Sequence, residues 1–425
     1  MYNYHADLIW LIDKILLYLV FFAVISTVLY AAAREYFWRK RSRALLKIKG
    51  NIYELALSGL KADSKVCLTA ASGVTAQQFL DVATNRSREI AFFNDSEQSI
   101  LKNCFISAEK LVLLERAAVS SWSKWRRAEA ILTLGYAQVT PALKVFKKTI
   151  YDKDPDISYF SVIALGQIKN IESAGILLDF IQKEPFYRYR IFSFLESFPS
   201  GICGKAAGLS GSSDPEIRNL AVKLICGFKA AEYSGIIEKL VSDEDARVRA
   251  SACYCLGEFG EKRFSGRILK CLSDDSWMVR VSAVGAFFKV RGEEGLPEIM
   301  GRINDGSLAV IESLKVLITN NIEVCLFYLE KFLNGNDEMA RRVSMEALEA
   351  SGYTVKLLQI LLAGGDREKE ISMNLLKGLI ASRAYPGLRG ALSGFPEGEK
   401  RKLLEIIRRI DKDASVILEE KAGGF

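Results

Sequence analysis

The chain is short of the residues that most enzymes use for acid–base and metal chemistry, because its 425 residues include a single histidine, His5. Histidine bases, Ser-His or Cys-His nucleophilic pairs and histidine-ligated zinc therefore lack their essential residue in the rest of the chain. The eight cysteines include no pair at the C-x₂-C spacing of metal and redox motifs. Cys253 and Cys255 point to different faces of a predicted helix, so we expect small, buried and reduced cysteines. No metal, cofactor or catalytic residue is predicted.

Proline is also scarce, with eight residues, which suits long helical stretches. The segment Gly208–Pro215 is rich in glycine and serine, but it lacks the Gly-Lys-Ser/Thr ending of a phosphate-binding loop. An ordinary turn between helices is expected there. Acidic residues gather at predicted turns, where helix capping accounts for them: Asp152, Asp154, Asp243, Asp245, Asp274 and Asp275.

One uncharged run lies near the N-terminus, from Ile15 to Ala33. At about 1.5 Å per residue, a helix of this length matches a hydrocarbon core of about 30 Å. Trp10 and the segment Tyr36–Trp38 flank the run, as aromatic rings do at the level of lipid headgroups. We therefore predict a transmembrane helix at residues 15–33, preceded by a short extracytoplasmic N-terminus at residues 1–14.

Basic residues follow the apolar run on one side only. Residues 34–49 contain seven basic residues against Glu35 and supply most of the net charge of +7. The positive-inside rule predicts a single-pass protein of the plasma (inner) membrane, N-out and C-in, with everything after residue 33 in the cytoplasm. The basic juxtamembrane segment, residues 34–60, is expected to meet anionic headgroups through Arg34, Arg39, Lys40, Arg41 and Arg43.

Two alternatives for the apolar run stay open. A cleavable secretory signal fits the small residues Ala31–Ala33, but the preceding segment is not positively charged and the following one is strongly basic. A buried core helix is the other alternative, and its flanks would seldom be so polarised in charge.

A period of 30 or 31 residues runs through most of the remaining chain. The segments that begin at Asp243 and Asp274 align, and each has an arginine six positions later, then an alanine and an apolar residue at helical spacing. This marker position recurs at Arg127, Ser158, Arg188, Arg218, Arg249, Arg280, Ile311 and Arg341, with weaker echoes near Lys369 and Lys400. We predict an all-α solenoid of helical hairpins over residues 111–425, after a linker and divergent helical cap at residues 61–110.

Each repeat is expected to hold two amphipathic helices. In one unit these would be Phe264–Leu272 and Trp277–Lys289, joined by the capping residues Ser273–Ser276. Leu-Gly pairs recur near the end of the second helix, and we expect each glycine to end or bend it: Gly135, Gly166 and Gly257.

These repeats resemble the HEAT family in its short form, which also occurs in phycobilin-lyase-like proteins. In that family an aspartate of the turn and an arginine of the second helix form a hydrogen-bond ladder between repeats. The resemblance implies a structural ladder in which Asp243 pairs with Arg249, and Asp274 with Arg280. It also implies interruptions at Ser158 and Ile311, where the arginine is replaced.

One segment, Phe186–Phe198, contains six aromatic residues. In HEAT hairpins the second helix lines the concave side, and positions one and five after the marker point away from the core. We apply this rule to the repeat that contains the aromatic segment and to the repeats on either side, and we add Arg190 beside Tyr189. The candidate partner-binding residues are then Tyr159, Tyr189, Arg190, Ser193, Asn219 and Lys223. Aromatic and arginine residues dominate interface hot spots, although a locally irregular aromatic core is an equal alternative.

The sequence favours a non-catalytic scaffold that binds a partner protein at the cytoplasmic face of the membrane. Membrane-tethered bacterial HEAT proteins resemble accessory subunits of membrane complexes, and a polysaccharide-synthesising glycosyltransferase is one such client. A bilin lyase or isomerase, like some short-repeat relatives, is the first alternative. A nucleic-acid-binding solenoid is the second, but the nearly neutral solenoid lacks the basic stripe that phosphate binding needs.

Overall fold

The computed structural model describes residues 2–57, 110–136 and 138–419. These residues form helices joined by short turns, and no strand occurs among them, so the predicted all-α fold is confirmed. They divide into two compact units, Met1–Ile202 and Cys203–Phe425. The predicted linker and cap at residues 61–110 falls outside the described residues, except for Lys110.

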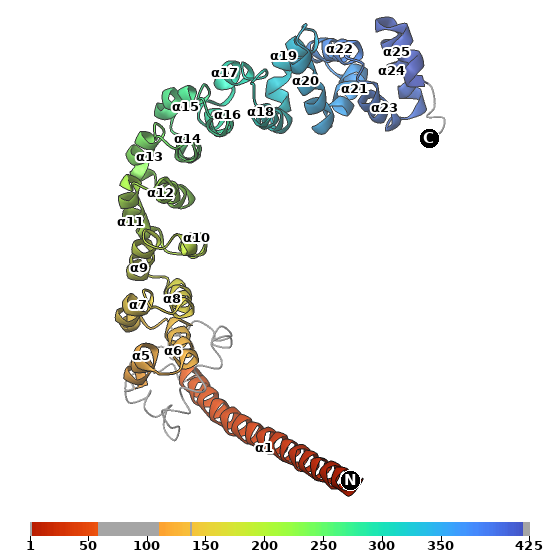
Figure 1. Cartoon of the computed structure of the whole chain (residues 1–425). Helices are drawn as coiled ribbons and strands as arrows, with labels where there is room; N and C mark the ends of the chain where they lie inside the picture. The colour runs from red at the N-terminus through yellow and green to blue at the C-terminus, as the bar shows by residue number, and fades with distance from the viewer. Residues whose placement is uncertain (1, 58–109, 137, 420–425) are drawn as a thin grey trace. The chain divides into compact units, whose positions relative to one another are not determined.

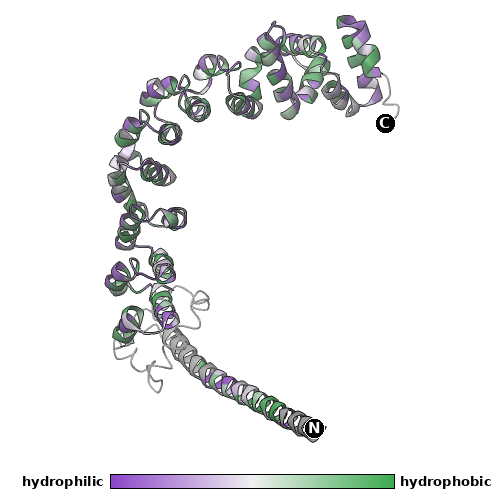
Figure 2. Ribbon diagram, viewed as in Figure 1, coloured by the Kyte–Doolittle hydropathy of each residue, from purple (hydrophilic) through white to green (hydrophobic). Residues whose placement is uncertain are grey.

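The first helix, α1, runs without a break from Tyr2 to Leu57 (Figure 1). Its segment Lys14–Lys40 is long and apolar enough to cross a membrane, judged by length and composition, and none of it is buried. Figure 2 shows this apolar stretch inside the helix. We predicted three separate segments, at residues 1–14, 15–33 and 34–60. The helix passes through all three because no proline or glycine interrupts it before Gly50.

Helical hairpins follow in the rest of the first unit. Their elements are α5 (Lys110–Ser120), α6 (Lys124–Tyr136), the 3₁₀ turn η2 (Thr140–Ala142), α7 (Leu143–Thr149), α8 (Pro155–Ile168), α9 (Ile171–Ile181), η3 (Pro185–Tyr187), α10 (Arg188–Leu195) and η4 (Ser200–Ile202).

The second unit continues the same hairpin pattern. Its first half contains α11 (Cys203–Gly208), η5 (Leu209–Gly211), α12 (Pro215–Gly227), η6 (Ala231–Tyr233), α13 (Ser234–Leu240), α14 (Ala246–Phe259), η7 (Lys262–Phe264), α15 (Ser265–Cys271), α16 (Trp277–Arg291), η8 (Gly292–Gly295) and α17 (Leu296–Met300). Its second half contains α18 (Leu308–Asn320), α19 (Ile322–Leu333), α20 (Glu338–Ala350), α21 (Tyr353–Ala363), α22 (Asp366–Ala381), α23 (Tyr385–Ser393), α24 (Glu397–Ile410) and α25 (Lys412–Glu419).

Aspartates and prolines begin several second helices in the way their sequence position predicts. Asp214 precedes Pro215 and accepts a hydrogen bond from the main-chain N–H two residues later, at 2.9 Å. Asp154 caps α8 in the same way, in front of Pro155. Since proline has no N–H to leave unsatisfied, it costs nothing at the first helical position. These caps fix where α8 and α12 start.

Within the second unit, the second helices of successive hairpins pack in a row, in the order α12, α14, α16, α18 and α20. The small or apolar positions three residues after the marker lie at these contacts, and Ala252, Ala283 and Leu314 are fully buried. One hairpin cannot bury its apolar face alone, so each repeat completes the core of its neighbour.

The glycine of the Leu-Gly pairs has a different role from the one we predicted. A Cβ atom on Gly257 would lie 2.5 Å from the Cα of Ala286 in the neighbouring helix α16. Gly257 does not end α14, which continues to Phe259 and stops at Gly260 with a φ of +69°. Gly257 therefore does not end the helix, the first of the two roles that we expected for it, and it permits close approach of two helix backbones.

Buried or partly buried arginines link successive turns of the second unit. The guanidinium of Arg280 donates to both carboxylate oxygens of Asp305, at 2.8 and 2.7 Å. It also donates to the main-chain carbonyls of Asp274 and Asp275, at 2.8 and 3.1 Å. Arg218 and Arg249 make the same contacts with Asp243 and Asp274, respectively. Each arginine thus ties its own turn to the next turn along the chain.

The predicted pairs of the ladder need a correction. We paired Arg249 with Asp243 and Arg280 with Asp274, but each guanidinium contacts only the main-chain carbonyl of that aspartate. The carboxylate that it binds lies 25 residues later, in the following turn. The physical reason is that the aspartate of its own turn already accepts from the preceding arginine, as Asp243 does from Arg218.

The corrected spacing also adds members that the sequence reasoning missed. Arg127 pairs with Asp152, 25 residues later, in the first unit. At the two replaced positions the contact differs: the Ser158 hydroxyl donates to the carbonyl of Ile150 at 2.6 Å, and Ile311 is buried in the core.

Candidate protein-interaction surface

Two strongly exposed aromatic side chains of the first unit lie at and just before the start of α10. Ile191 and Leu195 are fully buried, so they fix the core-facing side of this short helix. Tyr189 points away from that side and is 86% exposed, and Phe186, three residues earlier, is 89% exposed. The Arg190 guanidinium lies 4.8 Å from the centre of the Phe194 ring, within range of a cation–π contact. The rings of Phe186 and Tyr189 therefore face solvent, where they add little to the packing of the core.

The other aromatic side chains of this segment serve the core. The Tyr187 ring is almost fully buried, its hydroxyl donates to the carbonyl of Pro155 at 3.2 Å, and it stacks on the Tyr159 ring at 6.3 Å. Tyr159 is 36% exposed, so one part of its ring packs against the core and the other part faces solvent. Of the predicted surface residues, Ser193 is exposed, and its hydroxyl donates to the carbonyl of Arg190. The aromatic segment is thus divided between the core and the surface.

The two remaining predicted residues lie in the second unit, on α12. Lys223 is exposed, one turn from Asn219. Asn219 is half-buried, and its side-chain oxygen is buried without a hydrogen-bond partner in the described part of the chain. Asn219 was predicted to be exposed; it is instead partly enclosed, because α12 packs closely between neighbouring helices.

The rule that positions one and five after the marker face away from the core also applies to α14, although our prediction did not include this helix. Tyr254 lies five positions after Arg249 and is 49% exposed. A hydrogen bond with the Glu258 carboxylate, together with burial, raises the pKa of Tyr254 to about 12. Lys289 forms an ion pair with Glu258 and lies 5.3 Å from the centre of the Tyr254 ring. Applying the rule to every repeat would have found this tyrosine.

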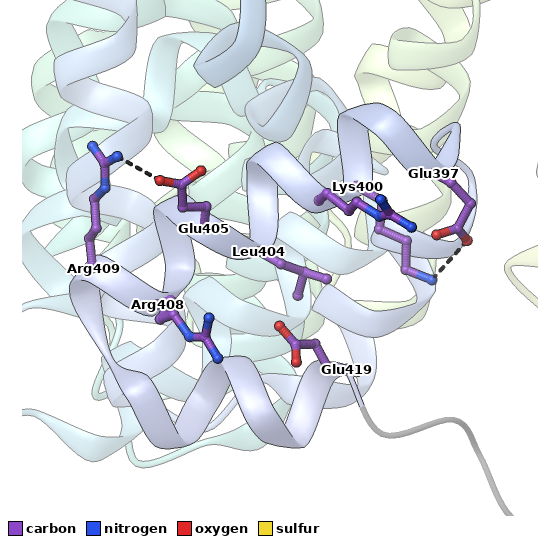
Figure 3. A pocket seen from close by; sticks show the side chains of 8 residues that line it. Glu397, Lys400, Leu404, Glu405, Arg408, Arg409 and Glu419 are labelled. Carbon is purple, nitrogen blue, oxygen red and sulfur yellow. Dashed lines mark hydrogen bonds and ion pairs between the residues drawn. The ribbon is translucent and has the colours of Figure 1, made fainter.

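A shallow groove of about 790 Å³ lies on α24 and α25 at the C-terminal end of the second unit (Figure 3). Most of its lining is charged, and the charges partly neutralise one another. Glu405 pairs with Arg409 at 2.8 Å, and Glu397 with Lys400 at 3.7 Å. Below this polar face, Leu403 and Ile407 pack into the core. The groove is therefore a polar surface above the apolar contacts of α24.

No group of three or more histidine, cysteine, aspartate or glutamate side chains could hold a metal ion within the described residues. Six cysteines fall in that part of the chain, all are free thiols, and five of them are buried. Burial raises the pKa of the Cys325 thiol to about 11, so it is far from reactive at neutral pH. Cys67 and Cys104 lie outside the described residues.

Comparison with known proteins supports the repeat assignment. The family model described as HEAT repeats matches residues 206–284 and 233–318. No curated protein matches the chain in sequence. Among solved structures, an engineered protein is 15% identical with a TM-score of 0.29, over 83% of this chain and 99% of that one. The YibA protein of Escherichia coli is 16% identical with a TM-score of 0.30, over 70% and 96%.

TM-scores this low do not support a structural relationship. The assignment of HEAT repeats therefore rests on the match to the family model together with the stacked helical hairpins. The match spans the part of the second unit in which α12, α14, α16 and α18 pack in a row and the arginine–aspartate ladder is continuous. Residues 206–318 therefore contain HEAT repeats.

Proposed function

We propose that this protein is a non-catalytic, membrane-tethered scaffold that binds a partner protein through the exposed side of its second helices. The observation that carries the proposal is the exposure of Tyr189 and Phe186, at 86% and 89%. Tyrosine is enriched among interface hot spots because it supplies a large rigid surface with a polar end. HEAT-repeat solenoids generally act through protein–protein contact, and such folds are typically non-catalytic.

The anchor in this proposal is α1. Its side chains from Lys14 to Lys40 are exposed, including Phe22 at 68%, and a bilayer would cover them. A secretory signal would pass the same test of length and composition. Arg34, Arg39, Lys40 and Arg43 project from the C-terminal end of the apolar stretch and favour an N-out, C-in orientation.

The partner we propose is a membrane-associated protein, with a polysaccharide glycosyltransferase complex as one client class. A scaffold on the cytoplasmic face meets such a partner at high effective concentration, because both are confined to one surface. The bilin lyase and nucleic-acid alternatives have less support. Several exposed basic residues of the second helices are paired with carboxylates, as Arg247 is with Asp245 at 2.9 Å and Arg409 with Glu405 at 2.8 Å, which leaves less free positive charge for phosphates.

The test is co-purification from membranes in mild detergent. Replacing Tyr189 and Phe186 by alanine should strongly reduce recovery of the partner, while the free energy of unfolding changes by less than about 0.5 kcal/mol, the usual range for surface changes. The matched control is Leu269→Ala, which removes an apolar side chain that is 41% exposed on the first helix α15. Equal recovery with all three proteins would refute the site.

A further inference from the structure

The first described hairpin has an exposed surface that the scaffold function does not use. This surface, named here the α5–α6 corner, consists of Val112, Leu113, Arg116, Val119, Trp122, Trp125 and Arg126. Trp122 is 92% exposed, and Trp125 is 69% exposed. Indole rings of this size are normally covered by protein, lipid or a partner.

The helical spacing of α5 explains why these side chains share one face. Leu114 and Ala118 are fully buried and define the side that packs on α6. Val112, Arg116 and Val119 follow one another at intervals of four and three residues, so they line the opposite side of the helix. The turn after α5 then presents Trp122 beside this apolar side.

The charges of the α5–α6 corner are positive, and no described carboxylate neutralises them. Nearby carboxylates are already engaged: Glu115 pairs with Lys144 at 2.9 Å, and Asp152 with Arg127. Among the described residues, no carboxylate forms an ion pair with the exposed side chains of Arg116 or Arg126. An anionic surface could therefore approach them without displacing an internal partner.

Tryptophan beside arginine on an amphipathic surface is the composition of protein segments that lie in the lipid headgroup region. The α5–α6 corner is also the first described surface after α1, with 52 residues between Leu57 and Lys110. If α1 spans the bilayer, this covalent link keeps the corner within reach of the lipid surface. Anionic headgroups would then attract Arg116 and Arg126.

We propose that the α5–α6 corner docks on the anionic surface of the membrane in which α1 is anchored, so that the solenoid is attached at two points. This proposal rests on the proposed anchor. The tryptophan rings would enter the boundary between headgroups and acyl chains, and the two arginines would contact lipid phosphates.

Tryptophan fluorescence of the full-length protein in lipid nanodiscs tests the proposal. The chain has five tryptophans, at positions 10, 38, 122, 125 and 277. One protein retains only Trp122 and Trp125, a second only Trp38 as the reporter of the anchor, and a third only Trp277 as a solvent control. The remaining tryptophans are replaced by phenylalanine, and circular dichroism checks that each protein keeps its helical content.

Each protein is placed in bilayers of phosphatidylglycerol and phosphatidylcholine, with and without brominated acyl chains. We expect the brominated lipid to quench at least about half of the Trp122 and Trp125 emission, because the apolar face of an interfacial segment is buried about 5–10 Å into the boundary between headgroups and acyl chains. The emission of Trp277 should not change. Substituting glutamine for Arg116 and Arg126 should clearly reduce the quenching of Trp122 and Trp125.

The three reporters separate failure of this proposal from failure of the anchor. Quenching of Trp38 without quenching of Trp122 and Trp125 would refute the lipid contact and leave the anchor standing. Absence of quenching at all positions would refute both. Blue-shifted but unquenched emission from Trp122 and Trp125 would mean that protein covers them, and equal quenching in pure phosphatidylcholine would refute the role of Arg116 and Arg126.

Discussion

Removing Arg280 is the perturbation that best tests how successive repeats are held together. Its guanidinium makes two hydrogen bonds to the Asp305 carboxylate and two to main-chain carbonyls of its own turn. The side chain of Arg280 is 16% exposed, and that of Asp305 is 5% exposed, so solvent screens this ion pair little. Arg280→Ala leaves a buried carboxylate without its guanidinium.

Breaking a buried ion pair from one side costs about 3–5 kcal/mol, and the partial exposure of Arg280 favours the lower end of that range. We therefore expect Arg280→Ala to lower the local free energy of opening by about 3 kcal/mol. Since about 1.4 kcal/mol corresponds to a factor of ten, amide protons in α16 and α18 should exchange roughly 100-fold faster. Hydrogen exchange of the full-length protein in mild detergent, read by mass spectrometry, measures this change.

Arg302→Ala is the matched control, because Arg302 makes an exposed hydrogen bond to the Ser273 hydroxyl at 2.6 Å. Its effect should stay within about 0.5 kcal/mol. A second control replaces both Arg280 and Asp305 by leucine, which removes the unpaired charge and should restore part of the lost stability. Equal exchange rates in Arg280→Ala and Arg302→Ala would refute the ladder as a stabilising element.

The same ion pair predicts an acid dependence. The hydrogen bond from Arg280 lowers the pKa of Asp305, although burial acts in the opposite direction. A carboxyl group with a lowered pKa in the folded state stabilises the protein above its unfolded pKa of about 3.9. This contribution is lost as the pH falls through the folded-state pKa. The difference in stability between wild type and Arg280→Ala should therefore narrow below about pH 4.

Three further predictions follow from the packing, the anchor and the cysteines. Gly257→Ala should destabilise the protein by about 1–3 kcal/mol because its Cβ would meet Ala286, whereas Gly285→Ala, with nothing within 4 Å, should be neutral or stabilising; thermal melts distinguish the two. A fluorescent protein fused after Phe425 should fluoresce and a phosphatase there should be inactive; active phosphatase would contradict the C-in orientation. At pH 7.5, Cys325 should react with a maleimide only after unfolding, since its pKa is about 11; rapid labelling of the native protein, read by mass spectrometry, would contradict its burial.

The repeat register could be predicted from sequence because it rests on residue types with one dominant structural use. Leu256 and Ala252 recur in phase with the marker, and both are fully buried. Aspartates before helices are strong capping signals, and Asp214 and Asp245 cap as expected. The helix boundaries of α15 and α16 agree with prediction to within a few residues for the same reason.

The contacts between repeats could not be predicted in the same way, because they depend on the distance between neighbouring helices. The choice between Asp243 and Asp274 as the partner of Arg249 follows from how the hairpins stack, which residue spacing alone does not determine. Gly257 has the same ambiguity, since a glycine near a helix end can terminate the helix or permit close packing. The exposure of Tyr189 and the burial of Tyr187 also depend on the local path of the chain.

Site-specific photo-crosslinking in intact cells tests whether the second helices of a membrane-tethered solenoid hold a partner protein. A photoreactive amino acid is placed at position 189 on α10 and, in a separate protein, at position 269 on α15. Both side chains are exposed, at 86% and 41%, but they lie on a second and a first helix, respectively. We expect a discrete adduct with a membrane-associated protein from position 189 and none from position 269. Adducts from position 269 alone, or from neither position, would refute partner binding by the second helices.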